Sequence, residues 1–499
     1  MYHVINPTIA SLIEKSCQSK ADEVFLVDDN QCLTGELLWK RICSVVTWLN
    51  KKGLKKGDVV AFYCTSSIPH AVTFFACLVC GVVPCCLHVR ETNERNKKNI
   101  NFVNAKYLFT DQVLFEQARN LIEDDVVIVL SPEFFEGKEN KFKTDHMDWN
   151  DLALILISSG TTGEPKCISH NQRTLAATAE YGPHSYNCWS NTDSTIIVMA
   201  PSFAAWVHTV LPFIFIQGRI VFSSQFDPAT FLKTLEVEKI TLAPLVPTMW
   251  RMVLAGNPKN YELSHLKTIF FSGEPGSESL VKDLQDKIGP NVMTSYLASE
   301  GGCASGVVAD SNILSVEGQA SSTGYVVKDA EVKIINPEGD FEEKNRVGEV
   351  GEIVLKSASV ALGYFANPAL SQKKFLNGWW RSGDLGVIDE NGLLYVKGRL
   401  DNQINTGGIK IHAEEVEACL LQHPYIQAAA VVGIPDDKWG QKIIAHIVSN
   451  YSEMNAEEIV NFCLINELLP KAHLPKEFYF HDKLPVGPTG KLYRRGLSA

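Results

Sequence analysis

The sequence predicts an α/β protein with a large N-terminal part and a separate, smaller α+β part at the C-terminal end. Up to about residue 320, apolar runs of strand length alternate with helical patterns, which is typical of a mainly parallel sheet covered by helices on both faces. Beyond that point the apolar residues alternate between turn residues, which indicates an antiparallel subdomain or a small barrel. The last part of the chain has its own pattern of helices and strands.

The first 150 residues alternate helices with strands. The amphipathic spacing over 36–52 predicts a helix that ends at Gly53, and the apolar run 58–64 predicts a buried strand.

The stretch 71–89 has no formal charge and is long enough to raise the question of a transmembrane helix. Gly81 and Pro84 interrupt it, because proline breaks a helix interior. We therefore expect a buried helix over 71–80, then a short core strand and no membrane span.

Strand-length apolar runs continue through the middle of the chain. They lie at 152–157, 196–199, 220–222, 240–242 and 269–271. Alternating strands follow at 324–335 and 348–355. In the C-terminal part we expect helices over 413–421 and 456–467, with strands over 428–434 and 442–448. The boundary near 398–401 divides the chain into domains of residues 1–398 and 399–499.

Composition excludes several classes of function. A formal net charge of −11 argues against general binding to nucleic acid or anionic membrane, although a local cluster of cations and amides can still hold a small anion. The 13 cysteines are scattered, and the first residues lack an apolar secretory segment, so we expect a cytoplasmic protein with free thiols. The Cys77–Cys80 pair has no second ligand pair at metal-site spacing.

The most informative loop, SSGTTGEPK at 158–166, follows a predicted buried strand. Its small residues let backbone N–H groups approach a ligand, and its hydroxyls and Lys166 can bind phosphate oxygens. Its spacing differs from the common nucleotide loop GxxxxGK[ST]. Taken alone, the loop fits a phosphate site and a flexible surface turn equally well.

This loop resembles the signature of the AMP-forming adenylating superfamily, which includes acyl-CoA synthetases, adenylation domains of peptide synthetases and beetle luciferases. Similar motifs follow in order: SGEPG at 272–276, YLASE at 296–300, WRSGDL at 380–385, the run 398–417 and PVGPTGKLYRR at 485–495. The resemblance covers nearly the whole chain and is strongest to acyl- and aryl-CoA ligases. It implies two mainly parallel sheets layered with helices, a small β-barrel-like subdomain and a mobile C-terminal domain.

The resemblance also implies which residues bind ATP or AMP. They are Ser158, Ser159, Gly160, Thr161, Thr162, Gly163, Lys166, Gly273, Glu274, Pro275, Tyr296, Asp384 and Arg399. The Tyr296 ring would lie on adenine, and Asp384 would accept both ribose hydroxyls, with Arg399 beside it. Ser299 replaces the usual threonine and keeps the hydroxyl for the α-phosphate, and Glu300 would hold Mg²⁺.

Lys491 is implied to be the catalytic lysine. A carboxylate that attacks the α-phosphate brings two anions together, so a cation is needed there. No general base is required, since a carboxylic acid is ionised at pH 7. Rotation about Asp401 would then withdraw Lys491 and bring the Lys410 face to the site for the thiol step. For Arg494 and Arg495 we expect a solvated basic tail.

The acid pocket departs from the family pattern. Ala204 stands where amino-acid-activating relatives carry Asp and many acyl-CoA synthetases carry His, so an α-amino acid has no obvious partner. Phe203, Trp206 and Val246 would give an apolar lining suited to an aryl or medium-chain acid. Trp206 could equally belong to the core.

Three functions remain open. The first is an ATP- and Mg²⁺-dependent ligase that joins a small carboxylic acid to coenzyme A. The second is an adenylation enzyme that loads the phosphopantetheine arm of a carrier protein. The third is a nucleotide-binding regulator that has lost catalysis. The retained Lys166, Glu300, Asp384 and Lys491 argue against the regulator, and the absence of an attached carrier domain favours free coenzyme A.

Overall fold

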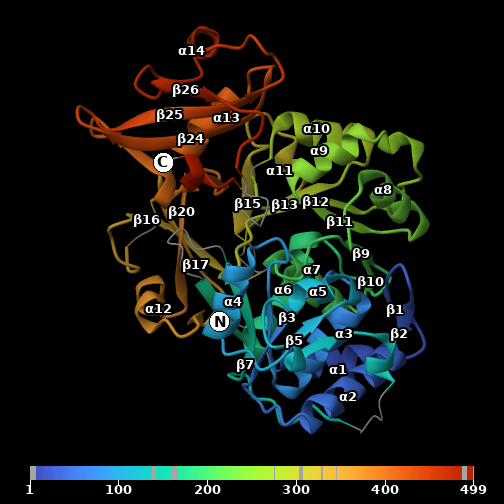
Figure 1. Ribbon diagram of the computed structural model, residues 1–499. Coiled ribbons are helices and arrows are strands. Elements are labelled where there is room, and N and C mark those ends of the chain that lie inside the picture. Colours follow the sequence, from blue (N-terminus) through green and yellow to red (C-terminus); the bar gives the residue numbers. More distant parts are fainter. Residues whose placement is uncertain are drawn as a thin grey trace. The chain divides into compact units, whose positions relative to one another are not determined.

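The computed structural model describes residues 7–136, 142–158, 166–274, 276–302, 307–326, 330–343, 346–485 and 492–497. Contacts within the chain define two compact units, which we call unit 1 and unit 2 (Figure 1). Unit 1 comprises Met1–Lys333, Val354–Ser382 and Glu390–Tyr395. Unit 2 comprises Ile334–Ile353, Gly383–Asp389 and Val396–Ala499. Two segments that precede residue 396 therefore belong to unit 2, and the predicted position of the mobile boundary stays a prediction.

One sheet of unit 1 has the strand order β18-β8-β7-β4-β3-β5-β6. Its strands are β3 (Val59–Tyr63), β4 (Val83–Cys86), β5 (Leu108–Thr110), β6 (Val127–Val129), β7 (Leu152–Ser158), β8 (Lys166–Asn171) and β18 (Gly363–Tyr364). The strands from β7 to β6 run parallel, as the alternating pattern predicts. β8 is antiparallel to β7, with which it forms a hairpin, and β18 is in turn antiparallel to β8.

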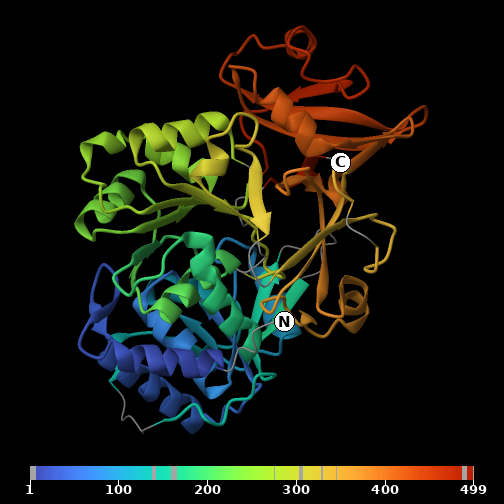
Figure 2. The ribbon, with the colours of Figure 1, turned by 180° about the vertical axis from the view of Figure 1, so that it is seen from behind.

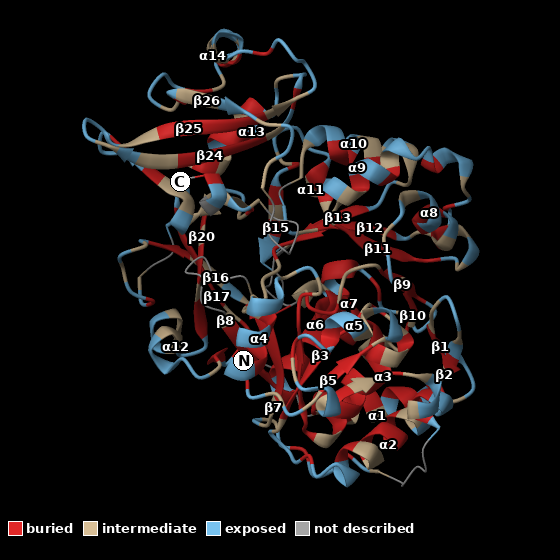
Figure 3. Ribbon diagram, in the orientation of Figure 1, coloured by how far each residue is buried: buried red, intermediate tan, exposed pale blue. Residues whose placement is uncertain are grey.

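Helix α3 (Ile68–Cys80) lies where the uncharged stretch raised the question of a membrane span. Ser67 caps its first turn, and Gly81 ends it in the left-handed region at φ 81°. The helix is buried almost throughout, and β4 follows it (Figure 3). The predicted buried helix and strand are thus confirmed. Within the described residues, no helix combines the length and the apolar character that crossing a bilayer requires.

The second sheet of unit 1 has the order β13-β12-β11-β9-β10-β1-β2. Its strands are β1 (Val24–Val27), β2 (Cys32–Thr34), β9 (Ser194–Ile197), β10 (Arg219–Phe222), β11 (Leu242–Leu245), β12 (Thr268–Phe271) and β13 (Val292–Ser295). All pairs are parallel except β1 with β2. The sequence predicts a strand at 240–242, whereas β11 covers Leu242–Leu245. Proline has no N–H to donate and argues against a strand, but in the structure Pro244 pairs with Phe270 of β12.

Helices fill both faces of this second sheet. The helices of unit 1 include α1 (Ile9–Ser19), α2 (Gly35–Lys51), α6 (Gln172–Tyr186), α7 (Ala204–Ile216), α8 (Pro228–Val237), α9 (Pro247–Ala255) and α10 (Glu278–Lys287). Phe270 faces the main core, which contains α1, α2, α3, α6 and α7, whereas Ile269 and Phe271 face α8, α9 and α10. Figure 2 shows α1 and α2 together in unit 1, away from α9 and α10.

Antiparallel strands begin after β13, and the change comes at β14, slightly before the predicted position near residue 320. They are β14 (Val307–Ala309), β15 (Ser322–Val326), β16 (Glu331–Ile335), β17 (Gly351–Lys356), β19 (Phe375–Leu376), β20 (Trp379–Ile388) and β21 (Leu394–Arg399). β14 pairs with both β13 and β15, and β15 pairs with β21. The antiparallel part is therefore a continuation of the parallel sheet.

The sheet of unit 2 has the order β23-β22-β25-β24, with β26 parallel to β25. Its strands are β22 (Gln403–Thr406), β23 (Ile409–His412), β24 (Ile426–Asp436), β25 (Gly440–Ser449) and β26 (Glu477–Phe480). Helices α13 (Ala413–Leu420) and α14 (Ala456–Ile465) pack on it around a core of its own. The predicted order of helix, two strands and helix is confirmed.

Candidate active site

Five predicted nucleotide and acid residues of unit 1 lie at one edge of the second sheet. Phe203 and Ala204 come after β9, Val246 directly follows β11, Gly273 comes after β12, and Tyr296 directly follows β13. These four strands are parallel neighbours. Their carboxyl ends therefore meet at the same edge, where open α/β sheets bind ligands.

The acid-pocket residues differ in how accessible they are. Phe203 and Val246 are partly buried, and the position that a Cβ on Gly273 would take lies 3.8 Å from Val246 Cγ1. The Phe203 ring lies 5.3 Å from the His88 ring, centroid to centroid. Trp206, by contrast, has no exposed surface, and its indole N–H donates to Ser66 Oγ at 3.0 Å.

Residues on both sides of the predicted phosphate loop form a strand pair. Ser158 ends β7 and Lys166 begins β8, and the two residues are directly opposite each other. Ser158 Oγ donates to the carbonyl oxygen of Lys166 at 3.5 Å. The loop thus starts at the carboxyl end of a buried strand, as predicted, and returns into a strand.

His170 connects this hairpin to the segment that carries Ser299. It lies four residues after Lys166 on β8, so the two side chains share one face of the strand. His170 Nε2 donates to the carbonyl oxygen of Ser299 at 2.9 Å. Burial lowers the pKa of His170 to about 4, so the ring is neutral at pH 7 and its proton resides on Nε2.

Tyr364 fixes the neighbouring carboxylate. It pairs with Ile168 of β8, and its hydroxyl donates to Glu300 Oε1 at 3.1 Å. The Ala361 N–H donates to the Glu300 carbonyl oxygen at 2.8 Å. The predicted phosphate hairpin and the predicted metal carboxylate therefore meet across β8 and β18. A carboxylate held in this way is the hard oxygen donor that Mg²⁺ prefers.

Neither His170 nor Tyr364 was predicted as a site residue. His170 had a local signal, since it shares the strand face of Lys166. Tyr364 had none, because it reaches Glu300 from a strand 64 residues further along the chain.

The turn that carries Glu300 is tightly packed. The N–H groups of Gly301 and Gly302 both donate to the Ala298 carbonyl oxygen. Gly302 has φ 70°, and a Cβ there would lie 2.7 Å from both the Cβ and the carbonyl oxygen of Ser359. Only glycine fits this position without a shift of the turn.

In unit 2 the two predicted ribose residues meet. Arg399 Nη1 donates to Asp384 Oδ1 at 2.6 Å. The preceding residue, Gly383, donates its N–H to buried Glu352 Oε1 at 3.0 Å. The Asp384 side chain is only 14% exposed, so its carboxylate is held in a fixed orientation.

The predicted thioester-step residues also lie in unit 2. Lys410 is exposed on β23, opposite Asn405 of β22. Gly407 and Gly408 join these strands with φ 59° and φ 83°, the positive values that a two-residue hairpin turn needs. Asp401, the predicted hinge residue, is exposed in a short 3₁₀ turn, Leu400–Asn402, between β21 and β22.

Several predicted residues lie outside the part of the chain that the structure describes. They are Ser159, Gly160, Thr161, Thr162, Gly163, Pro275 and Lys491.

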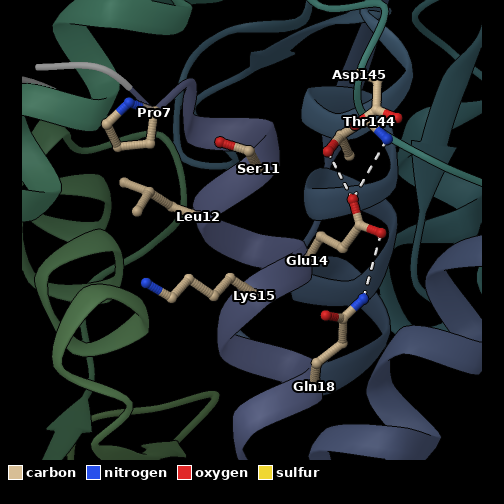
Figure 4. Close-up of a pocket in the computed structure, with 8 residues that line it drawn as sticks. All are labelled: Pro7, Ser11, Leu12, Glu14, Lys15, Gln18, Thr144 and Asp145. Carbon is tan, nitrogen blue, oxygen red and sulfur yellow. Dashed lines mark hydrogen bonds between the residues drawn. The ribbon is translucent and has the colours of Figure 1, made fainter.

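A hollow of about 390 Å³ lies elsewhere in unit 1, beside α1 (Figure 4). Its Glu14 carboxylate accepts hydrogen bonds from the Thr144 hydroxyl at 2.6 Å and from Gln18 Nε2 at 3.3 Å. These bonds connect α1 to the segment around Thr144. None of the predicted site residues lines the hollow, so we do not include it in the candidate site.

Two family models match the sequence. The model of AMP-binding enzymes matches residues 13–365, and the model of the AMP-binding enzyme C-terminal domain matches residues 415–491.

Curated relatives match over nearly their whole length. A 2-succinylbenzoate–CoA ligase of Bacillus licheniformis is 28% identical, over 97% of this chain and 98% of that protein. A feruloyl-CoA synthase of Amycolatopsis is 27% identical, over 93% and 92%.

Solved structures have the same fold. An o-succinylbenzoate CoA synthetase of Bacillus subtilis with its acyl-adenylate intermediate superposes with a TM-score of 0.88 at 24% identity, covering 98% of both chains. The ATP-bound MatB of Rhodopseudomonas palustris gives 0.88 at 22%, also over 98% of both.

Proposed function

Because the chain belongs to the family of AMP-binding enzymes, we propose that it is an ATP-dependent ligase that joins a small carboxylic acid to the thiol of coenzyme A. The observation that carries the proposal is the meeting of family motifs at one carboxyl edge of a parallel sheet. Gly273 and Tyr296 lie there, while His170 and Tyr364 hold the segment with Ser299 and Glu300.

In the proposed first step, a carboxylate oxygen of the acid attacks the α-phosphorus of ATP. The new P–O bond forms as the bond to pyrophosphate breaks, and acyl-AMP results. Lys491 would neutralise the charge that gathers on the transferring group, Glu300 would hold Mg²⁺, and Asp384 with Arg399 would orient the ribose.

In the second step, the coenzyme A thiol, as its thiolate, attacks the acyl carbonyl carbon. The thioester bond forms, the acyl–O bond breaks and AMP leaves. We propose that Lys410 serves this step after unit 2 turns about Asp401, so that one pocket supports both reactions.

For the acid we propose an aryl carboxylic acid. Ala204 provides no carboxylate for an α-ammonium group, and Phe203 and Val246 are apolar residues at the sheet edge. The relatives are named for 2-succinylbenzoate and feruloyl groups, which both contain a benzene ring.

ATP–pyrophosphate exchange with a panel of aryl, medium-chain and amino acids tests the first step. We expect exchange with at least one aryl acid and none with α-amino acids. Adding coenzyme A or a phosphopantetheinylated carrier protein then identifies the acceptor, and thioester formation only on the carrier would reject coenzyme A. If no acid supported exchange, the ligase proposal would fail in favour of a nucleotide-binding regulator.

Separate variants test the two lysines. Lys491→Ala should lower the adenylation rate by roughly 10²–10³-fold or more, because the cation at the α-phosphate is lost. It should spare thioester formation from supplied acyl-AMP. Lys410→Ala should show the reverse pattern and serves as the matched control. Near-normal acyl-AMP formation by Lys491→Ala would refute the assigned role.

We also propose a cytoplasmic location. In the described part of the chain every cysteine is a free thiol, as expected in a reducing compartment. Fractionation of the producing cells tests this, and recovery of the protein outside the cytoplasm would contradict it.

A further inference from the structure

Helix α13 presents two carboxylates to a single arginine near the C-terminal end. Glu414 and Glu417 are three residues apart and therefore lie on one face of the helix. Arg494 Nη2 lies 2.9 and 2.6 Å from the two oxygens of Glu417, and 3.5 Å from Glu414 Oε1. The expectation that Arg494 belongs to a solvated tail is therefore wrong. The side chain of Arg495 lies outside the described residues.

The ion pair is largely removed from water. The Glu417 side chain is 11% exposed and the Arg494 side chain 23%. Glu417 Oε1 also accepts the Val431 N–H of β24 at 2.7 Å. The carboxylate thus connects helix, sheet and C-terminal segment, and both of its oxygens accept charge-assisted hydrogen bonds from one guanidinium nitrogen, Nη2, which restricts where the Arg494 side chain can lie.

Arg494 lies only three residues after Lys491, and both sides of the intervening segment are anchored. The Tyr493 N–H donates to the Pro485 carbonyl oxygen at 2.9 Å. Leu484 and Leu492 pack with buried Leu497 against a cluster that includes three residues of β24 and β25, which are Ala430, Val432 and Ile444. The chain on either side of 486–491 is therefore attached to the sheet.

Glu414 also contacts the residues beside Asp401. Glu414 Oε1 accepts from Asn402 Nδ2 at 2.5 Å. A Cβ on Gly398 would lie 2.4 Å from Glu414 Oε2, so the chain passes directly against this side chain. Contacts thus run from 398–402 through α13 to Arg494.

We propose that Glu417 and Arg494 are positioning residues for adenylation: their ion pair sets the direction of the chain at 492–494 and thereby places Lys491. This inference rests on the proposed function. A displacement of about 1 Å at a reacting group can lower a rate about 10²-fold. The pair should therefore affect the step that uses Lys491 and leave the thiol step alone.

Arg494→Gln removes the cation and tests the pair in the full-length enzyme. We expect kcat for ATP–pyrophosphate exchange to fall about 10- to 100-fold, with KM for ATP and acid within about twofold. Thioester formation from supplied acyl-AMP and coenzyme A should stay within about twofold of wild type. Arg494→Lys should recover part of the loss, because its single ammonium nitrogen keeps the charge but replaces the planar guanidinium by a flexible point charge.

Lys442→Gln is the matched control. It removes another ion pair of unit 2, between Lys442 of β25 and Glu477 of β26. It should leave both half-reactions unchanged.

Three kinetic results would overturn the inference. They are unchanged exchange by Arg494→Gln, an equal fall in both half-reactions, or no recovery in Arg494→Lys. Thermal unfolding checks that each variant folds. If Arg494→Gln does not fold, Glu417→Gln replaces it, since the amide can still accept the Val431 N–H. Failure of both to fold would make the pair structural and the inference wrong. Absence of exchange in the wild-type enzyme with every acid would instead reject the proposed function.

Discussion

Glu417 is a buried carboxyl group that orients Arg494 but contributes little net stability to the fold. Burial raises the pKa of its carboxyl to about 7, while Arg494 and the Val431 N–H oppose that rise and Glu414 adds to it. A buried ion pair often contributes little net stability, because removing two charges from water costs about as much as their attraction returns. The pair at Glu417 is better explained by the geometry it imposes than by stability.

Glu417→Gln should therefore change how stability depends on pH. The folded-state pKa of about 7 lies above the ordinary value of 4.5, so the folded protein binds this proton more tightly than the unfolded chain does. The resulting stabilisation of the folded state is fully present below pH 4.5 and is lost as pH rises through 7. Relative to wild type, the free energy of unfolding of the variant should rise over this window by at most about 3 kcal/mol, at 1.36 kcal/mol per pKa unit. Urea unfolding at several pH values measures it, and a constant difference between variant and wild type would contradict the prediction.

Turns and hairpins are the elements that carry the candidate site. The turn with Ser299 and Glu300 rests on two glycine N–H groups that share one carbonyl acceptor, and on contact between Gly302 and Ser359. The turn has little room to adjust, since the atoms that a Cβ would meet include a backbone carbonyl.

Gly302→Ala should accordingly damage both stability and adenylation. Positive φ costs a non-glycine residue about 1–2 kcal/mol, and overpacking adds about 1–3 kcal/mol. Gly318→Ala is the matched control, since Gly318 has φ 79° but no atom within 4 Å of an added Cβ. It should show the backbone cost alone and keep normal exchange activity. Equal losses of unfolding free energy in the two variants would show that the contact with Ser359 is unimportant.

At the scale of the whole molecule, the described part of unit 1 buries four imidazoles, those of His70, His88, His170 and His208, and burial lowers the pKa of each. Burial is the main reason that the pKa lies at about 3 for His70, about 4 for His170 and about 3 for His208. In the unfolded chain each imidazole is protonated near its ordinary pKa of 6.5. Acid therefore favours unfolding of the unit that contains the second sheet and its carboxyl edge.

The free energy of unfolding should fall as pH drops from 6.5 towards 4, because the buried histidines bind protons in the unfolded chain but stay neutral in the folded protein. His70→Leu should flatten this dependence, since the Phe62, Phe74 and Trp206 rings surround His70. His265→Leu, at an exposed position, is the control. Denaturant unfolding between pH 4 and 7 provides the comparison, and a parallel pH dependence in His70→Leu and wild type would be the contrary result.

The sequence by itself determined the α/β class, the helix–strand–strand–helix order of the C-terminal part, the buried helix α3 and the family of the protein. These follow from local information, since apolar periodicity, capping residues and motif spacing are properties of contiguous segments. The strand β11 is an exception. Proline argues against a strand at position 244, but in the structure Pro244 pairs with Phe270 of the neighbouring parallel strand.

Only the tertiary structure decided which side chains meet. It placed Trp206 in the interior, joined His170 to Ser299 across 129 residues and paired Arg494 with Glu417 across 77. Local pattern shows that a helix or strand has an apolar face, but not which distant element covers that face. Such contacts are formed when whole elements pack together, so they depend on topology and burial over the entire chain.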